Sequence, residues 1–382
     1  MKIGIDISQV VYGTGVSVYT KNLVENLLKI DRKNQYLLFG SSLRRKKELH
    51  RYIAILLKRY PNVSAKIFPI PPTLLSLIWN KWHILPIENF IGNVDVFFSS
   101  DWTQPPVKQA KLITVVHDLV PWRYPKTLPK KIITTHHNRI KWVKKEVGVI
   151  IADSQSTQND LIKIIKIPKR KIYVVYPGID KKRFCPQNKE KINQIKRKYG
   201  LSNYILAVST REPRKNFIRI IEAFKKLSAQ GGPASGRKNR NFQLAIAGKY
   251  GWGEETKKLK NSKTPKLKTL GYVPDGDLAP LYSGARCFVY PSLYEGFGLP
   301  ILEAMACGCP VVTSNISSMP EVASEAAILI NPRKTTEITK AINKIINNEK
   351  MAEKLSKKGI EQAKKFSWEK CAKEVLGIMY RV

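Results

Sequence analysis

The chain has few cysteines, no long uninterrupted apolar run and no recognisable leader. Its five cysteines show no Cys-x-x-Cys spacing, which argues against a disulfide framework or a structural zinc site and favours a reducing compartment. The most apolar stretch, residues 68–90, is interrupted by prolines and by Lys81 and His83, so it cannot form one clean membrane-spanning helix. The opening residues lack the apolar core and cleavage site of a signal peptide. We therefore expect a cytoplasmic location.

Acidic residues are also scarce. Only 29 Asp and Glu accompany 67 Lys and Arg, which gives a formal net charge of +38. Such a field attracts polyanions, so nucleic acid, anionic membranes and phosphorylated substrates all suit it. No RNP-like aromatic motif, zinc finger or suitably placed GxxG is present, and the basic residues are scattered throughout. We therefore expect no nucleic-acid partner.

The pattern of apolar runs indicates an α/β protein. Short β-branched runs alternate with helical patterns, and the runs are apolar nearly throughout, as in parallel sheets covered by helices on both faces. The length suits two domains, and the turn-forming stretch 176–180 marks a boundary near residue 180. Residues 230–240 are expected to form an exposed, mobile loop. The predicted strands are 2–7, 36–39, 94–99, 111–116, 149–152, 172–176, 204–208, 243–247, 267–270, 287–290, 310–313 and 327–330.

The most informative stretch is the strand, loop and helix between Tyr290 and Ala306. The strand ends at Tyr290, and the helix is predicted to begin near Leu299 with a proline in its first turn. Free N–H groups and the helix dipole favour a diphosphate at such a helix start. Gly296 and Gly298 allow the backbone to approach a ligand closely.

Two carboxylates accompany this helix start. Glu303 lies about one turn into the helix, and Glu295 lies in the loop eight residues earlier. Their carboxylates are placed to reach sugar hydroxyls beside a phosphate. From the chemistry alone, an ordinary strand, loop and helix with solvated carboxylates explains the pattern equally well.

The run EGFGLPILEAMACGCPVVTSN, residues 295–315, resembles glycosyltransferase family 4, the glycosyl transferases group 1, and carries that family's Glu-x7-Glu pattern. The resemblance continues in family order through most of the chain. The further matching segments are the opening glycine loop, VHDLVP (116–121), PGIDKKRF (177–184), EPRKN (212–216), VPDGDLAPLYSGA (273–285) and SSMPEV (317–322).

This resemblance implies a GT-B fold, with two Rossmann-like domains whose parallel sheets face each other across a cleft. It implies an acceptor-side domain at residues 1–180 and a nucleotide-sugar-binding domain at 181–365. Residues 366–382 would form a closing helix that crosses back to the first domain, with Trp368 as a packing anchor.

The resemblance also assigns donor-binding residues. Glu303 would bind the ribose hydroxyls, Glu295 would lie beside the sugar, and the 271–273 loop would lie against the nucleobase. An ordinary role as a loop aromatic stays open for Tyr272. The donor-binding set is Gly13, Gly15, Gly271, Tyr272, Val273, Gly296, Phe297, Gly298, Leu299 and Glu303. The opening loop is no dinucleotide fingerprint, because Val18 occupies its third glycine position.

Four residues are candidates for catalysis: His117, Glu295, Arg214 and Lys215. The departing diphosphate needs cations, and a guanidinium beside an ammonium suits it, although a solvated basic face is the plainer alternative for this pair. Many relatives carry another arginine where this chain has Thr210, and whether Arg211 or Arg214 replaces it is left open.

His117 follows the predicted strand 111–116, at the strand end where α/β proteins bind ligands. The matching family histidine lies near the donor sugar, although a lone histidine is more often structural.

The family transfers sugars with retention of configuration, and no side chain here stands out as a covalent nucleophile. We expect a front-face route in which the departing phosphate oxygen deprotonates the acceptor. Asp275 and Asp277 could mimic a metal-binding Asp-x-Asp, but we expect Asp277 or its neighbour to cap a short helix. Cys307 and Cys309 are too few for zinc. Neither a metal nor a cofactor is expected.

Residues 44–60 form a basic amphipathic pattern. A helix packed on its own sheet with a solvated basic face explains the pattern. The alternative is docking on an anionic membrane, with the apolar stretch around Trp79 and Trp82 nearby, at the inner face of the cell membrane. A lipid-linked acceptor would fit that setting.

The overall pattern looks most like bacterial mannosyl- or rhamnosyltransferases of polysaccharide pathways. GDP-mannose is therefore the favoured donor, before UDP-glucose or dTDP-rhamnose, and the acceptor is a polysaccharide or a lipid-linked saccharide. The alternative is a basic protein of the same scaffold that binds nucleic acid or anionic membrane without transferase activity. A phosphorylase would be far longer, and an epimerase would lack the Glu-x7-Glu loop.

Overall fold

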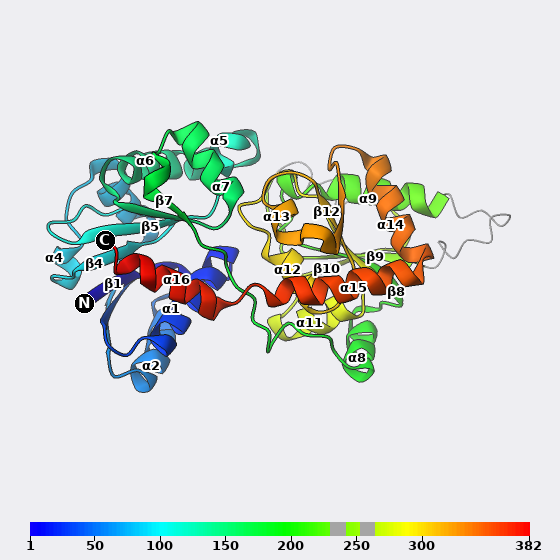
Figure 1. Cartoon of the computed structure of the whole chain (residues 1–382), viewed down its shortest axis with the longest axis horizontal. Helices are drawn as coiled ribbons and strands as arrows, with labels where there is room; N and C mark the ends of the chain where they lie inside the picture. The colour runs from blue at the N-terminus through cyan, green and yellow to red at the C-terminus, as the bar shows by residue number, and fades with distance from the viewer. Residues whose placement is uncertain (230–241, 253–263) are drawn as a thin grey trace. The chain divides into compact units, whose positions relative to one another are not determined.

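The computed structural model describes residues 1–229, 242–252 and 264–382. The loop predicted at 230–240 lies outside these ranges. The chain divides into two compact units (Figure 1): residues 1–178 together with 368–382, and residues 179–367. The boundary predicted near residue 180 lies close to the point where the first unit gives way to the second.

The first unit contains a parallel sheet of seven strands in the order β3-β2-β1-β4-β5-β6-β7. Its strands are β1 (Lys2–Asp6), β2 (Gln35–Ser41), β3 (Val63–Phe68), β4 (Val96–Ser99), β5 (Lys111–Val116), β6 (Val149–Ala152) and β7 (Ile172–Val174). Strand β3 was not predicted. It lies at the sheet edge, and Ser64 and Lys66 interrupt the apolar run that marks the other strands.

Helices cover both faces of this sheet. The α-helices are α1 (Gly15–Ile30), α2 (Lys46–Arg59), α3 (Pro72–Leu75), α4 (Glu88–Ile91), α5 (Val120–Arg123), α6 (Lys130–Glu146), α7 (Gln155–Asp160) and α16 (Trp368–Met379). The 3-10 and π-helical segments are η1 (Ser8–Val11), η2 (Ser76–Trp82), η3 (Pro125–Thr127), η4 (Leu161–Ile165) and η5 (Lys169–Lys171).

The last helix, α16, packs against α1 in this first unit. The Trp368 ring is buried and lies edge-on to the Tyr19 ring of α1, with 5.7 Å between their centroids. Trp368 is therefore a packing residue of the first unit, although it follows the whole of the second unit in the sequence.

The predicted basic helix 44–60 is α2, and its apolar stripe faces its own sheet. Leu49, Ile53 and Leu56 are buried, and the Leu49 side chain fills the space that a Cβ at Gly40 of β2 would occupy. The sequence suggested that Trp79 belongs to an apolar stretch available to a membrane, and this is wrong for Trp79. It is fully buried, because it packs against Phe39 from the other face of the sheet.

The second unit contains a parallel sheet of six strands in the order β10-β9-β8-β11-β12-β13. Its strands are β8 (Asn203–Val208), β9 (Phe242–Ala247), β10 (Leu267–Gly271), β11 (Cys287–Tyr290), β12 (Val311–Ser314) and β13 (Ala327–Ile330). Its helices are α8 (Lys189–Tyr199), η6 (Pro213–Lys215), α9 (Phe217–Ala229), α11 (Asp275–Ser283), α12 (Leu299–Ala306), α13 (Met319–Ala323), η9 (Ser324–Ala326), α14 (Thr335–Asn347) and α15 (Glu349–Lys364).

The second sheet is apolar on both faces, as predicted. One core lies between the sheet and α11 and α12, and the other between the sheet and α9 and α14. This layering leaves the loops at the carboxyl ends of the strands to carry polar groups. Among the helices in the described part of the chain, none is long and apolar enough to cross a membrane.

Candidate active site

Two basic residues and one acidic residue meet at the carboxyl edge of the second sheet. Arg214 and Lys215 lie in the turn η6 after β8, and Glu295 lies in the loop after β11. Strands β8 and β11 are neighbours in the sheet, so the segments that follow them start side by side. Asn216 holds the turn in place by donating from Nδ2 to the carbonyl of Pro291 at 2.9 Å.

The carboxylate of Glu295 is engaged by three donors. Lys215 Nζ lies 2.6 Å from its Oε1, and Arg214 Nη1 lies 2.9 Å from its Oε2. The Tyr290 hydroxyl donates to Oε1 at 2.8 Å. Arg214 also pairs with Glu212 at 2.5 Å and donates to the carbonyl of Tyr294. The predicted cations and the predicted carboxylate thus form one buried cluster.

The charges of this cluster depend on one another. Burial disfavours the ionised form of Glu295, but Arg214 and Lys215 outweigh burial and lower the pKa of this carboxyl to about 2. Burial and the neighbouring Arg214 lower the pKa of Lys215, while Glu295 opposes that shift. Glu295 is therefore an anion across the physiological pH range.

The glycine loop before α12 is held by hydrogen bonds to its backbone. Gly298 is the N-cap of α12 and has φ = 109°, a conformation that favours glycine. The Ser318 hydroxyl donates to the carbonyl of Phe297 at 2.7 Å and to that of Glu295 at 3.0 Å. The helix start at Leu299 is as predicted, and the Ser318 hydrogen bonds hold the loop that precedes it.

Glu303 lies on α12 and is half-buried. The Tyr282 hydroxyl of α11 donates to its Oε2 at 3.0 Å. Burial raises the pKa of Glu303 to about 7, although the Tyr282 hydrogen bond opposes the rise. The carboxyl therefore changes charge close to neutral pH, unlike Glu295.

The loop predicted to lie against the nucleobase, residues 271–273, follows β10. Gly271 has φ = 66°, and a Cβ there would meet nothing within 4 Å. Tyr272 is 60% exposed, and Lys249 Nζ lies 4.8 Å from the centroid of its ring. The side chain of Val273 is buried in the core, so only its backbone is available to a ligand. Gly296 is buried within its loop.

In the first unit, His117 follows β5 and is held by a buried carboxylate. Its Nδ1 lies 2.6 Å from Oδ2 of Asp153, which follows β6. Tyr19 places its ring edge-on to the imidazole, with 4.7 Å between centroids. Burial lowers the pKa of His117, but the charge of Asp153 outweighs it and raises the pKa to about 9.

The other imidazole nitrogen of His117, Nε2, is buried and has no hydrogen-bond partner in the described ranges. The Thr157 hydroxyl donates to the backbone carbonyl of His117 at 3.2 Å, which fixes the backbone of His117. The pairing with Asp153 was not predicted, because the two residues are far apart in the sequence and only the order of β5 and β6 in the sheet brings them together.

Arg139 is a further buried charge in the first unit, and it was not predicted from the sequence. It lies on α6, is fully buried, and donates to Thr114 Oγ1 at 2.7 Å and to the carbonyl of Val115 at 2.8 Å. It also pairs with Asp101 at 3.1 Å. Arg139 lies four residues, about one helical turn, from both Thr135 and Val143, which are buried. This spacing places Arg139 on the buried face of α6 and was the signal in the sequence that could have revealed its burial.

Gly13 and Gly15 lie in the first unit, at the start of α1. Gly13 has φ = 65°, and Thr14 caps the helix by accepting from the backbone N–H of Ser17 at 3.3 Å. A Cβ at either glycine would meet nothing within 4 Å, so the local packing does not require glycine.

Asp277 does not cap α11, and this part of the prediction is wrong. Pro274 occupies the N-cap position and no side chain caps the helix. Asp277 accepts from Lys198 Nζ and the Tyr199 hydroxyl, each at 2.6 Å, because α8 packs alongside. Across the described residues, no group of three or more His, Cys, Asp or Glu is placed to hold a metal ion.

The two arginines that could replace the missing one at Thr210 lie in different surroundings. Arg211 is fully buried, with its guanidinium carbon 4.2 Å from the centroid of the Tyr250 ring. Arg214 contacts Glu295 directly, as described above.

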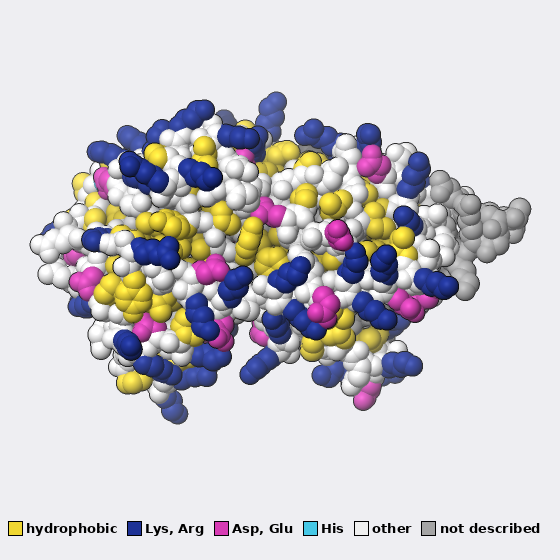
Figure 2. Space-filling view, in the orientation of Figure 1, with side chains coloured by type: hydrophobic (Ala, Val, Ile, Leu, Met, Phe, Trp, Pro, Cys, Tyr) yellow, Lys and Arg dark blue, Asp and Glu magenta, His cyan; other side chains and the backbone are white. Residues whose placement is uncertain are grey.

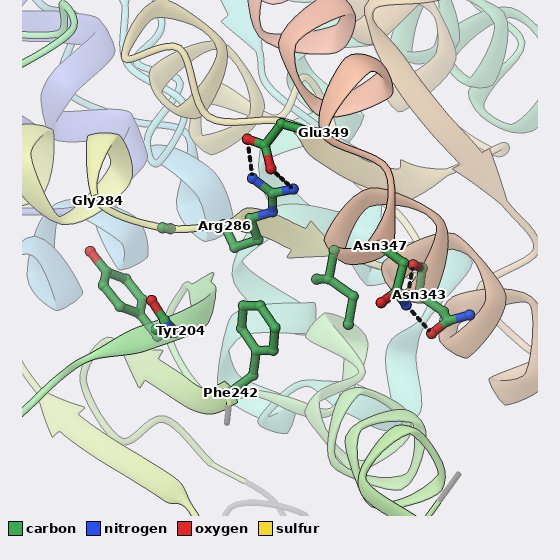
Figure 3. A pocket seen from close by; sticks show the side chains of 10 residues that line it. Tyr204, Phe242, Gly284, Arg286, Asn343, Asn347 and Glu349 are labelled. Atoms are coloured by element: carbon green, nitrogen blue, oxygen red, sulfur yellow. Dashed lines mark hydrogen bonds and ion pairs between the residues drawn. The ribbon is translucent and has the colours of Figure 1, made fainter. Parts of the chain in front are cut away.

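A pocket of about 960 Å³ lies at the opposite edge of the second sheet (Figure 3). Asn203, Phe242 and Arg286 line it at the amino ends of β8, β9 and β11, and Arg286 forms a two-pronged ion pair with Glu349 at 2.9 and 3.0 Å. The predicted donor residues of this unit lie at or after the carboxyl ends of β10 and β11, so this pocket is separate from the candidate site.

Comparisons with known proteins identify the family of the chain. Residues 188–362 match the family model described as Glycosyl transferases group 1, and residues 13–183 match Glycosyltransferase Family 4. O-antigen chain mannosyltransferase B of Escherichia coli is 30% identical over 71% of this chain and 70% of the relative. The serotype-specific mannosyltransferase WbdA of Escherichia coli is 29% identical over 68% of this chain but 32% of its own length.

Among solved structures, Alr3699/HepE from Anabaena, in complex with UDP and glucose, has a TM-score of 0.72. It is 17% identical, and the match covers 100% of both chains, so it supports the fold. Two parallel Rossmann-like sheets with this match constitute the GT-B architecture. The chain therefore belongs to glycosyltransferase family 4, the glycosyl transferases group 1.

Proposed function

We propose that the chain transfers a mannosyl group from GDP-mannose to a polysaccharide or lipid-linked saccharide, with retention of configuration and without a metal ion. Relatives named mannosyltransferases support the sugar. A structural neighbour in complex with UDP and glucose supports a nucleotide-sugar as the donor class. UDP-glucose and dTDP-rhamnose are the next donors to test.

The observation that carries the proposal is the cluster of Arg214, Lys215 and Glu295 beside the glycine loop. A nucleoside diphosphate at the start of α12 would receive N–H groups and the positive end of the helix dipole. Lys215 and Arg214 would turn part of their hydrogen bonding from Glu295 to the phosphate oxygens. The negative charge that develops on the leaving group is thereby stabilised.

Glu303 would accept hydrogen bonds from the ribose hydroxyls through its carboxylate. Its half-buried position and its hydrogen bond from Tyr282 orient the carboxylate for this role. The exposed Tyr272 and the backbone of Gly271 and Val273 would lie beside the base.

His117 would donate from Nε2 to a hydroxyl of the donor sugar. Asp153 accepts from Nδ1 and so keeps the imidazole protonated and oriented. Gly13 and Gly15 would let the backbone before α1 approach the diphosphate and the acceptor, since neither position is filled by packing.

The sugar would move by a front-face route. The bond from the anomeric carbon to the phosphate oxygen breaks, and the bond to the acceptor oxygen forms on the same face. The acceptor proton passes to the departing phosphate oxygen. Glu295 is a poor covalent nucleophile, because three donors already occupy its carboxylate, and Arg214 and Lys215 outweigh burial and hold its pKa at about 2.

Two cations at the diphosphate can supply the charge that other glycosyltransferases obtain from a divalent ion, and this supports metal-independent transfer. We propose a cytoplasmic location, where nucleotide-sugars are available, and nucleic acid is not a partner in this proposal.

A screen of GDP-mannose, UDP-glucose and dTDP-rhamnose with the purified chain and EDTA tests the proposal. Mass spectrometry of the products should show hexose transfer or slow donor hydrolysis with GDP-mannose, and NMR should show the anomeric configuration retained. The Glu303→Ala variant serves as the site control. Turnover of another donor but not of GDP-mannose would overturn the proposed donor. Loss of activity with EDTA would overturn metal-independent transfer, and an inverted anomeric configuration would overturn retention.

A further inference from the structure

The segment between Leu74 and Leu85, which contains η2, exposes several large apolar side chains. We call it the 74–85 surface. The exposed side chains are Leu74, Leu77, Trp82, Ile84 and Leu85, each between 41% and 55% exposed. Apolar side chains scattered singly on a surface need no explanation, but five within twelve residues of one segment form a candidate interaction site.

The fold holds these side chains outward. His83 and Leu85 have φ of 56° and 58°, a left-handed backbone that is uncommon for a bulky residue such as leucine. The buried Trp79 stabilises it, because its Nε1 donates to the carbonyl of Leu85 at 3.0 Å. The N–H of Ile84 donates to the carbonyl of Ile78 at 3.1 Å. The exposure is therefore built into an anchored turn.

Helix α6 is joined to this turn by three contacts. The His83 ring stacks on the Trp142 ring, with 3.6 Å between centroids and 4° between planes. Trp142 Nε1 donates to the carbonyl of Asn80 at 2.9 Å, and His83 Nε2 lies 2.7 Å from Oε2 of Glu146. The exposed face of α6 therefore continues the 74–85 surface.

That face is basic. Lys141 and Lys145 place their ammonium groups 5.2 Å and 5.1 Å from the centroid of the Trp142 ring. The exposed lysines of η2 and α6 are Lys81, Lys130, Lys131, Lys141, Lys144 and Lys145. The one acidic residue in those two helices, Glu146, pairs with His83. Figure 2 shows Lys and Arg side chains spread over the part of the first unit where Figure 1 labels α6.

The basic helix α2 offers a weaker surface. Its exposed large apolar side chains are Ile55 and Leu57, and its one aromatic ring of this kind, Tyr52, is half-buried rather than exposed. It also lies on the other face of the sheet, because consecutive residues of β2 point to opposite faces. Phe39 of β2 packs against Trp79, while Gly40 packs against Leu49 of α2.

We propose that the 74–85 surface and the lysines of α6 dock the protein on an anionic lipid bilayer. Leucine, isoleucine and tryptophan side chains enter the interfacial zone of a bilayer, while lysines beside them meet anionic headgroups. A protein partner of ordinary surface composition offers no comparable sheet of negative charge. This inference goes beyond the proposed transfer reaction and does not depend on which donor is used.

Sedimentation of the full chain with phospholipid vesicles tests this docking. We expect binding to phosphatidylglycerol–phosphatidylcholine vesicles, little binding to phosphatidylcholine alone, and release at high salt. Trp82→Ser with Ile84→Ser should lower the bound fraction at least about tenfold. Lys141→Glu with Lys145→Glu should lower it by a similar factor, since each lysine near an anionic surface contributes about fivefold.

The matched controls are Ile55→Ser with Leu57→Ser, and Lys58→Glu with Arg59→Glu, on α2. Both should bind the vesicles as the natural chain does. No binding by the natural chain, or equal loss in the α2 variants, would overturn the proposal. So would a dimer in sedimentation velocity without lipid that Trp82→Ser with Ile84→Ser dissociates, since the occupant would then be a second copy.

Thermal unfolding of every variant shows whether it folds. Vesicle binding is read without substrate, so a failure of the proposed transfer reaction leaves this result unaffected.

Discussion

Lys215 Nζ lies 2.6 Å from Oε1 of Glu295, and the two side chains are only 10% and 9% exposed. The two residues are 80 positions apart in the sequence and follow neighbouring strands. The pair therefore depends on the completed sheet, and it links stability of the second unit to the chemistry proposed there.

A double-mutant cycle should detect this pair. Lys215→Met and Glu295→Gln should each destabilise the protein, because each leaves the other buried group without its partner. The coupling between them should be about 1–3 kcal/mol, as for neighbours in one network. Denaturant unfolding of the four proteins measures it, and additive effects would contradict the pairing.

The same pair should make stability depend on acid pH. The folded-state pKa of Glu295, about 2, lies below its ordinary value of 4.5. The contribution of the pair is therefore fully present above the unfolded value and is lost as the pH falls through the folded one. The Glu295→Gln variant should show a flatter stability curve over this range, measured by urea unfolding. A curve parallel to that of the natural chain would contradict the assignment.

Lys215→Ala should lower kcat/KM by roughly a hundredfold to a thousandfold, equivalent to about 2.7–4 kcal/mol of transition-state stabilisation, by analogy with the loss of one oxyanion donor. Lys226→Ala on α9 is the matched control, because it removes an exposed lysine from the same unit. Assays run well below the unfolding temperature separate this loss from the lower stability of the variant. Normal turnover in Lys215→Ala would place the diphosphate elsewhere.

Glu303 should make nucleotide affinity depend on pH. Burial raises its pKa to about 7, so the carboxylate that would accept the ribose hydroxyls gains population as the pH rises through neutrality. We expect the Kd for GDP, measured by calorimetry, to fall between pH 6 and pH 8, a range of about one unit on each side of that value.

Glu303→Gln should bind GDP weakly and without that pH dependence, with a loss of about 1.5–3 kcal/mol for hydrogen bonds to a charged group. The control Glu325→Gln removes an exposed carboxylate of the same unit, which pairs with Lys358. An unchanged pH profile in Glu303→Gln would remove Glu303 from the ribose site.

His117 should stabilise the first unit below neutral pH. Its folded-state pKa of about 9 lies above its ordinary value of 6.5, because the charge of Asp153 outweighs burial. Its contribution, at most about 3 kcal/mol, is fully present below pH 6.5 and is lost as the pH rises through 9. Asp153→Asn should remove this dependence in denaturant unfolding, whereas His50→Gln on the exposed face of α2 should leave it intact.

Much of the fold could be predicted from local pattern. Every predicted strand overlaps an observed one, because buried parallel strands are continuous apolar runs. The edge strand β3 could not be found this way, since Ser64 and Lys66 face solvent along it. Trp79 was misplaced for a related reason. A stretch rich in tryptophan and leucine does not reveal which side chain reaches the core.

The site was predictable where a motif is continuous. The glycine loop and the start of α12 are encoded within ten residues, and their helix start was confirmed. The partners of the predicted residues were not foreseeable, because Tyr290, Asp153 and Ser318 reach them through strand order and loop packing. Asp277 illustrates the converse, since a favourable capping residue was diverted to Lys198 and Tyr199 on a neighbouring helix.

The packing of α16 on α1 has a consequence for synthesis on the ribosome. The first unit needs residues 368–382, whereas the second unit is complete at residue 367. The second unit can therefore finish folding before the first one does, even though it is translated later. Until α16 emerges, the face of α1 around Tyr19 lacks its cover, and a nascent chain stalled before that point would present an unfinished amino-terminal domain to chaperones.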